Sequence, residues 1–310
     1  MEPIAYVNGD YIPISKAALH VFDLGVVAGA TVSEMIRTFG HRPFRLPEHL
    51  DRMQRSQAAL GFETRLTVAE WTAICQHVVS ENSKFIPSHH DLGLIAFVTA
   101  GQNLTYLGQA DRDRSRRGTV CVHTFPLPFE LWAETYEHGI HLVTVETRSI
   151  PDQTLDARIK HRSRLHWHVA DQQAKQKETT AVAVLSDNEG YLTETSAGNV
   201  WLVHGKTLVT PAKNVLHGIS RDEVFLLANV LHLPAQLHSC RPQNIASADE
   251  VFISSTPNCL LPVTKYNGQP VGHGHPGPIF RQLINAWSQS VGIDIVEQMQ
   301  RGAIDRKSAS

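Results

Sequence analysis

At 310 residues, with 42% hydrophobic and 19% charged residues, the chain has the composition of a globular protein rather than a disordered one. Its formal net charge of -2 excludes the general basic field with which many proteins bind nucleic acid. The longest apolar stretches are too short to span a bilayer, and the N-terminus lacks the regions of a signal peptide, so we expect a cytoplasmic protein that binds no membrane.

The first part of the chain reads as a mixture of strands and helices. Residues 4–14 form two short apolar runs around Asn8-Gly9, which is a typical hairpin signal. The other elements expected here are strands over 31–39, 42–46, 92–99 and 119–124, and helices beginning at Pro47 and covering 68–79. This mixture predicts an α+β domain.

The domain boundary is expected near residue 125, because a chain of this length usually forms two domains. Two prolines in Phe125-Pro126-Leu127-Pro128-Phe129 suit an extended crossover. We therefore predict a small N-terminal domain over 1–124, a linker over 125–130 and a larger C-terminal domain over 131–310.

The second part of the chain is predicted to be rich in strands. A long helix is expected to begin near Ile159 or Lys160. The other expected elements are strands over 141–147, 180–186, 199–204, 207–209 and 250–254, and helices over 221–231 and, as the last one, 278–290.

Lys160 is the first candidate catalytic residue, because the basic residues His161, Arg162 and Arg164 follow it closely. Nearby cations and partial burial would lower the pKa of a lysine, as a nucleophilic lysine requires at neutral pH. Taken alone, however, a surface lysine in a basic patch is the simpler interpretation.

Two segments predict an anion site. Gly218 directly precedes an apolar-periodic helix, so the N–H groups of Ile219 and Ser220 would point out of a helix N-terminus. Ser255 and Thr256 follow a strand and offer hydroxyls where α/β proteins commonly bind ligands. A serine N-cap and a strand-end turn explain these segments as well.

Two further charged side chains are candidates. Arg52, on the helix after Pro47, could supply a planar cation for a phosphate, although most single arginines on helices are solvated. Glu194 lies among small polar residues just before a strand and could pair with a protonated ring nitrogen, or could belong to an ordinary polar turn.

No metal site is expected, although the chain has 18 histidines. His161, His166 and His168 share a predicted helix but lack the i, i+4 pairing of zinc-binding helices. The four cysteines are widely scattered, as expected of reduced thiols.

Taken in chain order, these motifs resemble the class IV (fold type IV) enzymes that depend on pyridoxal 5′-phosphate (PLP). That family includes branched-chain aminotransferases, D-amino acid aminotransferases and 4-amino-4-deoxychorismate lyases. The matching landmarks are Tyr6 to Gly9, Asp23 to Arg37, Phe44 to Met53, Lys160, Glu194 to Asn199, Gly218 to Arg221, and Ser255-Thr256. They cover nearly the whole chain.

The resemblance implies a fold and a set of roles. The fold would be α+β, with a small N-terminal domain, a larger barrel-like β domain with helices, PLP between them, and usually a homodimer. Lys160 would carry PLP as a Schiff base and move a proton, Glu194 would pair with the pyridine nitrogen, and Asn199 would support the Glu194 turn. The residues implied to hold the phosphate are Arg52, Ile219, Ser220, Ser255 and Thr256.

On the substrate side the chain departs from the best-known members. Ala28 and Ser33 stand where aromatic residues usually line the entry, and Ala100 to Asn103 contains no Arg-x-His carboxylate trap, which argues against D-amino acid specificity. Arg164 and Asn258 complete the candidate substrate residues. The substrates implied are an amino acid and a 2-oxo acid.

Three functions remain open at this point. Aminotransfer is favoured, because residues 272–279 resemble the tail of aminotransferase-like members. A lyase that releases pyruvate and 4-aminobenzoate is the alternative, because residues 160–165 resemble the lyase Lys-His-x-x-Arg-Leu run and Asn258 falls near an asparagine that such lyases use. A PLP-binding protein with little catalysis is the third, because Ala28 and Ser33 could leave the pocket incomplete.

Overall fold

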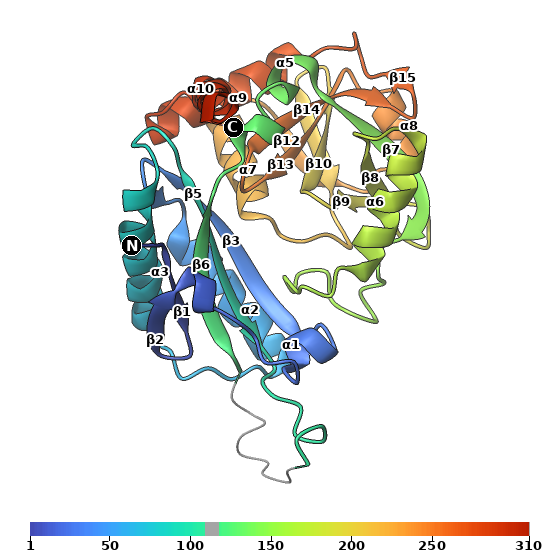
Figure 1. Cartoon of the computed structure of the whole chain (residues 1–310). Coiled ribbons are helices and arrows are strands. Elements are labelled where there is room, and N and C mark those ends of the chain that lie inside the picture. Colours follow the sequence, from blue (N-terminus) through green and yellow to red (C-terminus); the bar gives the residue numbers. More distant parts are fainter. Residues whose placement is uncertain (109–117, 310) are drawn as a thin grey trace. The chain divides into compact units, whose positions relative to one another are not determined.

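The structure is a computed structural model that describes residues 1–108 and 118–309, with side chains through Asp305 (Figure 1). The chain divides into two compact units. One comprises Met1–Leu127 and Ile159–Arg164, and the other comprises Pro128–Arg158 and the chain from Leu165 onward. Ile159–Arg164, which we grouped with the second domain from sequence, packs with the first unit, and the domain limits themselves stay a prediction.

The first unit is built on a six-stranded antiparallel sheet with the order β2-β1-β6-β5-β3-β4. The predicted opening hairpin is confirmed. The strands are β1 (Ile4–Val7), β2 (Asp10–Pro13), β3 (Thr31–Phe39), β4 (Arg42–Pro43), β5 (Leu92–Thr99) and β6 (Val120–Pro126). The helices are η1 (Ile14–Lys16), α1 (Leu24–Val27), α2 (Leu46–Leu60), α3 (Val68–Asn82) and η2 (Ser83–Phe85).

The helices α2 and α3 cover this sheet, and their ends follow from the local sequence. Pro47 occupies the first turn of α2, and Gly61 ends the helix in the left-handed conformation at φ 67°. Thr67 and Glu70 form a capping box at the start of α3. Apolar side chains of both helices then pack with the inner face of the sheet in one core.

The predicted helix start at Ile159 or Lys160 is wrong, because helix α6 begins at Leu165. The segment Ile159–Arg164 is instead held against β3. The Ser33 N–H donates to the Lys160 carbonyl at 3.0 Å, and the Arg162 N–H donates to the Thr31 carbonyl at 2.9 Å. The Lys160 carbonyl is thus used by the strand, and the Arg164 N–H, which would donate to it in a helix, donates instead to the Arg162 carbonyl at 2.9 Å.

The second unit contains a nine-stranded sheet that closes on itself. Because β9 pairs with β10, the strands β9, β10, β13, β14, β7 and β8 form a ring, which is the barrel-like arrangement expected. The strands are β7 (Ile140–Arg148), β8 (Val182–Ser186), β9 (Leu192–Thr195), β10 (Asn199–His204), β11 (Thr207–Pro211), β12 (Ala235–His238), β13 (Glu250–Ser255), β14 (Cys259–Tyr266) and β15 (Gln269–Pro270).

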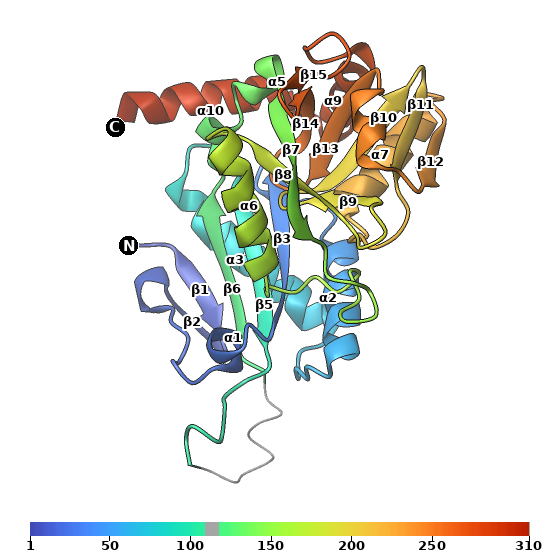
Figure 2. The same ribbon diagram turned by 90° about the vertical axis from the view of Figure 1, so that its right-hand side faces the viewer.

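Helices pack on the outside of this sheet, and Figure 2 shows α6 lying along β7 and β8. The helices are η3 (Phe129–Leu131), α5 (Thr135–His138), α6 (Leu165–Lys177), α7 (Ile219–Val230), α8 (Pro242–Ala246), α9 (Pro278–Val291) and α10 (Ile295–Ala309). The expectation that the helix over 278–290 is the last one is wrong. Left-handed Gly292 ends α9, and α10 follows with Ile295, Met299 and Ala303 buried at i, i+4 and i+8.

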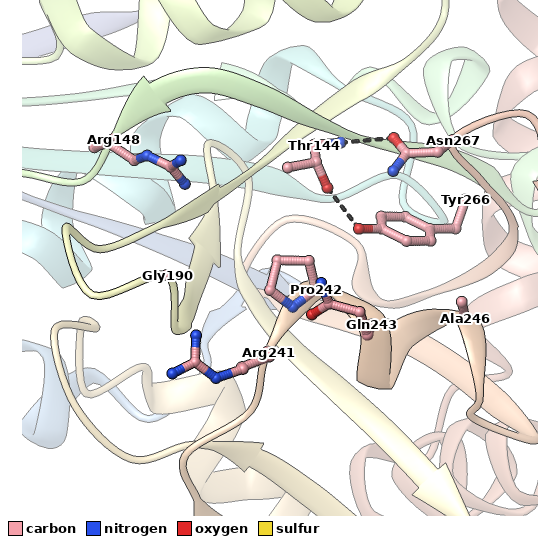
Figure 3. Close-up of a pocket in the computed structure, with 9 residues that line it drawn as sticks. All are labelled: Thr144, Arg148, Gly190, Arg241, Pro242, Gln243, Ala246, Tyr266 and Asn267. Carbon is pink, nitrogen blue, oxygen red and sulfur yellow. Dashed lines mark hydrogen bonds between the residues drawn. The ribbon is translucent and has the colours of Figure 1, made fainter.

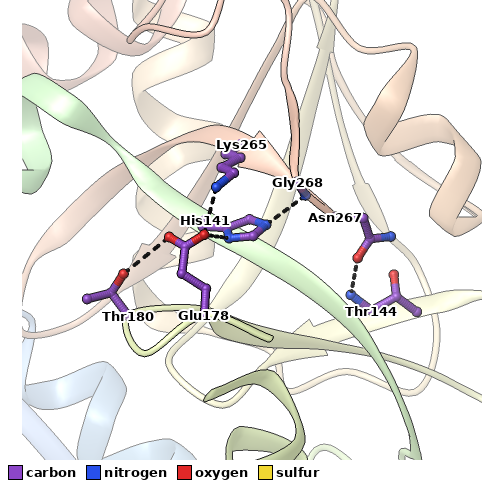
Figure 4. A network of polar contacts seen from close by, with 7 residues as sticks. All are labelled: His141, Thr144, Glu178, Thr180, Lys265, Asn267 and Gly268. Carbon is purple, nitrogen blue, oxygen red and sulfur yellow. Dashed lines mark hydrogen bonds and ion pairs between the residues drawn. The ribbon is translucent and has the colours of Figure 1, made fainter. Parts of the chain in front are cut away.

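A polar network fastens the end of α6 to the sheet (Figure 4). Glu178 accepts from His141 Nδ1 at 2.9 Å and from Lys265 Nζ at 2.6 Å. The Gly268 N–H donates to His141 Nε2 at 3.0 Å, so the ring proton of a neutral His141 lies on Nδ1. In the part of the chain that the structure describes, no helix is long and apolar enough to cross a membrane.

Candidate active site

Lys160 lies half-buried in the first unit, with its backbone fixed from two sides. Its N–H donates to the Ser56 hydroxyl of α2 at 3.1 Å, and its carbonyl accepts from Ser33 of β3. Three residues further on, the Ser163 hydroxyl donates to the Gly29 carbonyl at 2.7 Å. The starting point of the lysine side chain is therefore set by hydrogen bonds to two separate elements.

A cluster of buried charged and polar side chains lies at the face of α2 that carries Ser56. His49, Arg52 and Ser56 follow one another at spacings of three and four, which places them on one side of α2. Glu34 of β3 faces this side and accepts from Arg52 Nε at 2.8 Å, from Arg52 Nη2 at 2.6 Å and from His49 Nδ1 at 2.7 Å. The carboxylate thus has a bidentate arginine and a histidine as partners.

The protonation states follow from this geometry. Burial by itself would raise the pKa of Glu34, but Arg52 and His49 outweigh burial and lower the pKa to about 2. Burial lowers the pKa of His49, and the carboxylate of Glu34 only partly offsets this, while Arg52 and Lys160 lower it further. A neutral His49 donates from Nδ1 to Glu34, so its Nε2 keeps a lone pair.

The His49 Nε2 atom is buried and has no hydrogen-bond partner among residues 1–108 and 118–309. Arg52, our predicted phosphate ligand, is 3% exposed and bound to Glu34. Its role toward a phosphate stays a prediction.

In the second unit, Glu194 and Asn199 lie opposite each other on β9 and β10. Asn199 Nδ2 donates to Glu194 Oε2 at 3.1 Å and to the Leu216 carbonyl at 3.0 Å. The Leu216 N–H donates to the same Glu194 oxygen at 3.1 Å. One oxygen of the Glu194 carboxylate is therefore held by two donors, which fixes the direction of the side chain.

The turn between β9 and β10 is built by Thr195. Its hydroxyl oxygen accepts from the N–H groups of Ala197 at 3.2 Å and Gly198 at 2.9 Å, and its own N–H donates to the Gly198 carbonyl at 3.0 Å. A threonine in this position satisfies the turn locally. Glu194 consequently precedes a rigid turn.

Helix α7 begins at Ile219, as the sequence predicted, with Gly218 as its N-cap and no side-chain capping bond. A Cβ on Gly218 would lie 2.2 Å from Asn199 Oδ1, so only glycine fits beside this asparagine. Ile219 and Ser220 are buried in the first turn, where backbone N–H groups lack intrahelical acceptors.

Buried donors without acceptors gather near this helix start. Ser255, which ends β13 next to the residue paired with Asn199, is 6% exposed, and its hydroxyl has no partner among the described residues. Nε and Nη1 of Arg221, which is 4% exposed, likewise have no hydrogen-bond partner among the described residues. Burial lowers the pKa of Arg221, and Asp222 and Glu194 partly offset this.

The chemistry of this donor set decides which group fits. Uncapped helix N–H groups, a serine hydroxyl and a guanidinium all require oxygen acceptors, and leaving them unpaired in a buried place is costly. A phosphate ester supplies several acceptor oxygens and a matching negative charge. The residues present therefore fit the phosphate of PLP.

The remaining predicted residues are distributed over both units. Ala28 caps the C-terminus of α1, Ser33 binds Lys160 through its backbone, and Arg164 ends the Lys160 segment, all in the first unit. Asn258 and half-buried Thr256 lie between β13 and β14 in the second unit. Asn258 accepts from the Tyr136 hydroxyl through its carbonyl, while its Oδ1 is buried without a partner among the described residues.

Sequence reasoning missed four residues that contact the candidates. Ser56 and His49 could have been found, because polar residues repeating at helical spacing beside Arg52 indicate one buried polar face. Glu34 lies on β3, and its contact with that face could be seen only in the structure. Arg221 was part of a recognised motif, but its burial could be seen only in the structure.

Comparison with known proteins gives a consistent result. Residues 31–266 match a family model described as amino-transferase class IV. Branched-chain-amino-acid aminotransferase-like protein 1 of Arabidopsis thaliana is 30% identical over 92% of this chain and 50% of its own length. The chain thus spans about half the length of the first curated relatives that it matches.

Two further matches extend over nearly the full length of both chains. A D-alanine aminotransferase of Bacillus licheniformis is 27% identical over 92% of this chain and 95% of its own. A solved branched-chain amino acid aminotransferase of Escherichia coli has a TM-score of 0.84 at 23% identity and covers 93% of this chain and 94% of that one. This structural likeness shows the fold.

Proposed function

We propose, from the premise that the chain belongs to the class IV aminotransferase family, that it transfers an amino group from an amino acid to a 2-oxo acid with PLP as cofactor. Class IV aminotransferases use PLP. The observation that carries the proposal is a pair of features in the second unit: the half-buried carboxylate of Glu194, held in one direction, and buried donors near the start of α7 that fit a phosphate.

Each proposed role follows from the chemistry of a side chain. Lys160 would supply the amine that holds PLP through its aldehyde carbon, with release of water, and would afterwards move a proton to and from the substrate carbon. Glu194 keeps the ring nitrogen protonated, and Asn199 keeps Glu194 in place. When bound, PLP supplies an electron sink for the carbanion that forms on the substrate. The residues proposed to hold the phosphate are Arg52, Ile219, Ser220, Ser255 and Thr256.

The neutral His49 belongs to this proposal as a neighbour of Lys160. Because burial lowers the pKa of His49, the ring adds no positive charge beside the lysine, and an ionised Glu34 keeps its single proton on Nδ1. An amine must lose its proton before it can act as a nucleophile. A histidine that remains neutral while hydrogen bonded to a carboxylate is compatible with that requirement.

Aminotransfer is preferred to the lyase reaction, because the relatives and the solved structure reported above are named as aminotransferases. They are named for branched-chain and for D-alanine substrates, and we propose only the shared class, amino acids and 2-oxo acids. Ala28, Ser33, Arg164 and Asn258 are our proposed substrate contacts.

We also propose a homodimer in the cytoplasm. The dimer rests on the resemblance to class IV enzymes, in which homodimers are usual. The location is supported by the cysteines Cys75, Cys121, Cys240 and Cys259, which are all buried and unpaired with one another, as in a reducing compartment.

The test is a half-reaction in which each of the L- and D-amino acids is mixed with the PLP-loaded protein and absorbance is recorded. We expect at least one donor to convert the bound cofactor to the pyridoxamine form, and a 2-oxo acid to reverse the change. Pyruvate released from aminodeoxychorismate without any acceptor would instead indicate the lyase. Bound cofactor that no donor converts would contradict aminotransfer.

A further inference from the structure

A pocket lies in the second unit, and none of the residues that line it has a role in the proposed aminotransferase reaction (Figure 3). Its volume is about 500 Å³, within the range of small-molecule sites. It is formed by β7, the turn between β8 and β9, helix α8 and the turn between β14 and β15. The residues that line it are Thr144, Arg148, Gly190, Arg241, Pro242, Gln243, Ala246, Tyr266 and Asn267.

Arg241 is held in place although it is exposed. Its Nη1 donates to the Glu189 carbonyl at 3.2 Å, and its guanidinium lies 4.3 Å from the ring centre of Tyr191. Gly190, in the left-handed region at φ 82°, leaves room for this approach, because a Cβ there would lie 3.2 Å from Nη1, closer than an ordinary contact. These contacts already restrict the rotamers of the Arg241 side chain. Ligand binding therefore costs less conformational entropy than it would for a free arginine.

The charge of the pocket is positive. Arg148 provides a second guanidinium at the end of β7, on the same side of the pocket as Gly190 and Arg241 in Figure 3. Neither arginine forms an ion pair within the described residues, and the nine lining residues include no carboxylate. Two uncompensated guanidiniums around one cavity favour an anion with planar or tetrahedral oxygens.

The opposite side is polar and uncharged. The Thr144 and Tyr266 hydroxyls share a hydrogen bond of 2.5 Å, and the Thr144 N–H donates to Asn267 Oδ1 at 3.0 Å. Asn267 and Gly268 form a tight turn with φ 46° and 84°, which fixes the amide beside the strand. This wall offers hydroxyl and amide groups to the neutral part of a ligand.

We propose that this pocket binds a small organic molecule that carries a doubly charged oxyanion, either a phosphate or a pair of carboxylates. Arg148 and Arg241 bind the charged end, and Gln243, Asn267 and the Thr144–Tyr266 pair contact the uncharged remainder. A cavity of about 500 Å³ is larger than an inorganic anion requires, so the ligand has an organic part. The site is independent of the proposed aminotransferase reaction.

The experiment is calorimetric titration of the PLP-loaded protein, whose cofactor occupies the phosphate donors of the first site. The probes are ribose 5-phosphate and succinate, titrated at constant ionic strength set with sodium chloride. The variants are Arg148→Gln, Arg241→Gln and Gly190→Ala. The matched control is Arg281→Gln, which removes an exposed arginine on α9 that does not line the pocket.

We expect at least one probe to bind, and each arginine variant to weaken that binding by roughly tenfold or more, since a charge-assisted hydrogen bond contributes at least that much. Gly190→Ala keeps both arginines but displaces Arg241, and should weaken binding severalfold. Arg281→Gln should bind as the parent does. The relative affinities of the two probes show whether the pocket prefers a phosphate ester or a dicarboxylate.

Two results would overturn the proposal: no heat of binding for either probe at millimolar concentration, or binding that persists unchanged in both pocket arginine variants. A melting curve of each variant separates lost binding from lost folding. If Arg241→Gln unfolds, Gly190→Ala and Arg148→Gln still test the pocket.

Discussion

At the scale of single residues, two candidate carboxylates, one in each unit, are held by fixed partners. Glu34 is buried with Arg52 and His49, and one oxygen of Glu194 is bound by Asn199 and by a backbone N–H. Glu34 therefore stays ionised at neutral pH, and neither carboxylate can reorient freely. Removing a partner of Glu34 should therefore alter both the protonation of its carboxylate and the geometry of its side chain.

Glu34 should make the protein sensitive to acid. Its pKa is about 2 in the folded chain against an ordinary value of 4.5, so the stabilisation is complete above pH 4.5 and is lost as the pH falls toward 2. The difference corresponds to about 3 kcal/mol. We expect Glu34→Gln to lower the urea midpoint at neutral pH and to remove much of the loss of stability between pH 4.5 and 2.

The control is Glu81→Gln, which breaks the exposed pair with Lys84 in the same unit. Solvent screens an exposed pair, so the pair contributes little to stability, and the urea midpoints of Glu81→Gln should match those of the parent at every pH. A Glu34→Gln variant with the parental acid profile would refute the buried ion pair as the cause.

Asn199 should matter for cofactor binding through Glu194. Asn199→Asp replaces the amide donor by a second carboxylate beside Glu194, so the two negative charges repel and the direction of Glu194 is lost. We expect PLP affinity to fall by roughly tenfold to a hundredfold, as for the loss of a hydrogen bond to a charged group. Equilibrium dialysis of PLP measures the change.

Asn214→Asp is the matched control, because Asn214 donates to Asp187 in the same unit through an equivalent amide–carboxylate bond. It should leave PLP affinity unchanged. If both variants bind PLP as tightly as the parent, Glu194 does not hold the cofactor through the Asn199 contact.

At the scale of elements, the segment Ile159–Arg164 is the part whose structure the sequence predicted least well. The apolar and basic pattern after Ile159 is compatible with a helix, and only pairing with the edge of β3 explains why the helix begins at Leu165. Non-local pairing of this kind leaves no periodic signal in the sequence. The consequence is that Lys160 is placed by β3 and α2 rather than by its own helix.

This placement predicts a local effect of Ser56→Ala. The Lys160 N–H would lose its acceptor at a cost of about 1 kcal/mol, and the segment would open more often. Hydrogen exchange followed by mass spectrometry should show faster exchange, by roughly fivefold, in peptides that contain residue 160.

Ser83→Ala is the control, because its hydroxyl bonds the Ser80 carbonyl on the exposed end of a helix. It should leave exchange at residue 160 unaltered. Equal protection of residue 160 in Ser56→Ala and in the parent would show that the hydroxyl does not fix the segment.

Elements with a strong local pattern were predicted well. The strands β3, β5 and β10 have the predicted limits, since alternating or continuous apolar residues end at clear turn signals. Helix α10 was missed, although its buried residues recur every fourth position with polar residues between them, as in an amphipathic helix.

At the scale of the whole molecule, the family could be recognised from the order of weak motifs along the chain. A glycine before a helix or a serine after a strand is common by itself, but together with Lys160 and Glu194 in the family order these segments predicted the class IV fold. The family match over residues 31–266 and the structural likeness confirm it.

The contacts between these motifs could not be predicted in the same way. Which donor holds Glu194, and which side chains remain buried without acceptors, depends on how segments distant in sequence pack. The pocket around Arg148 and Arg241 likewise combines four separate segments, none of which carries a motif.

The central claim is that Lys160 bonds the aldehyde of PLP. The direct measurement is borohydride reduction of the PLP-loaded protein followed by peptide mass spectrometry. The account predicts one pyridoxyl group, attached to residue 160, and none in Lys160→Ala treated in the same way. A pyridoxyl group on another lysine, or none in the parent protein, would contradict it.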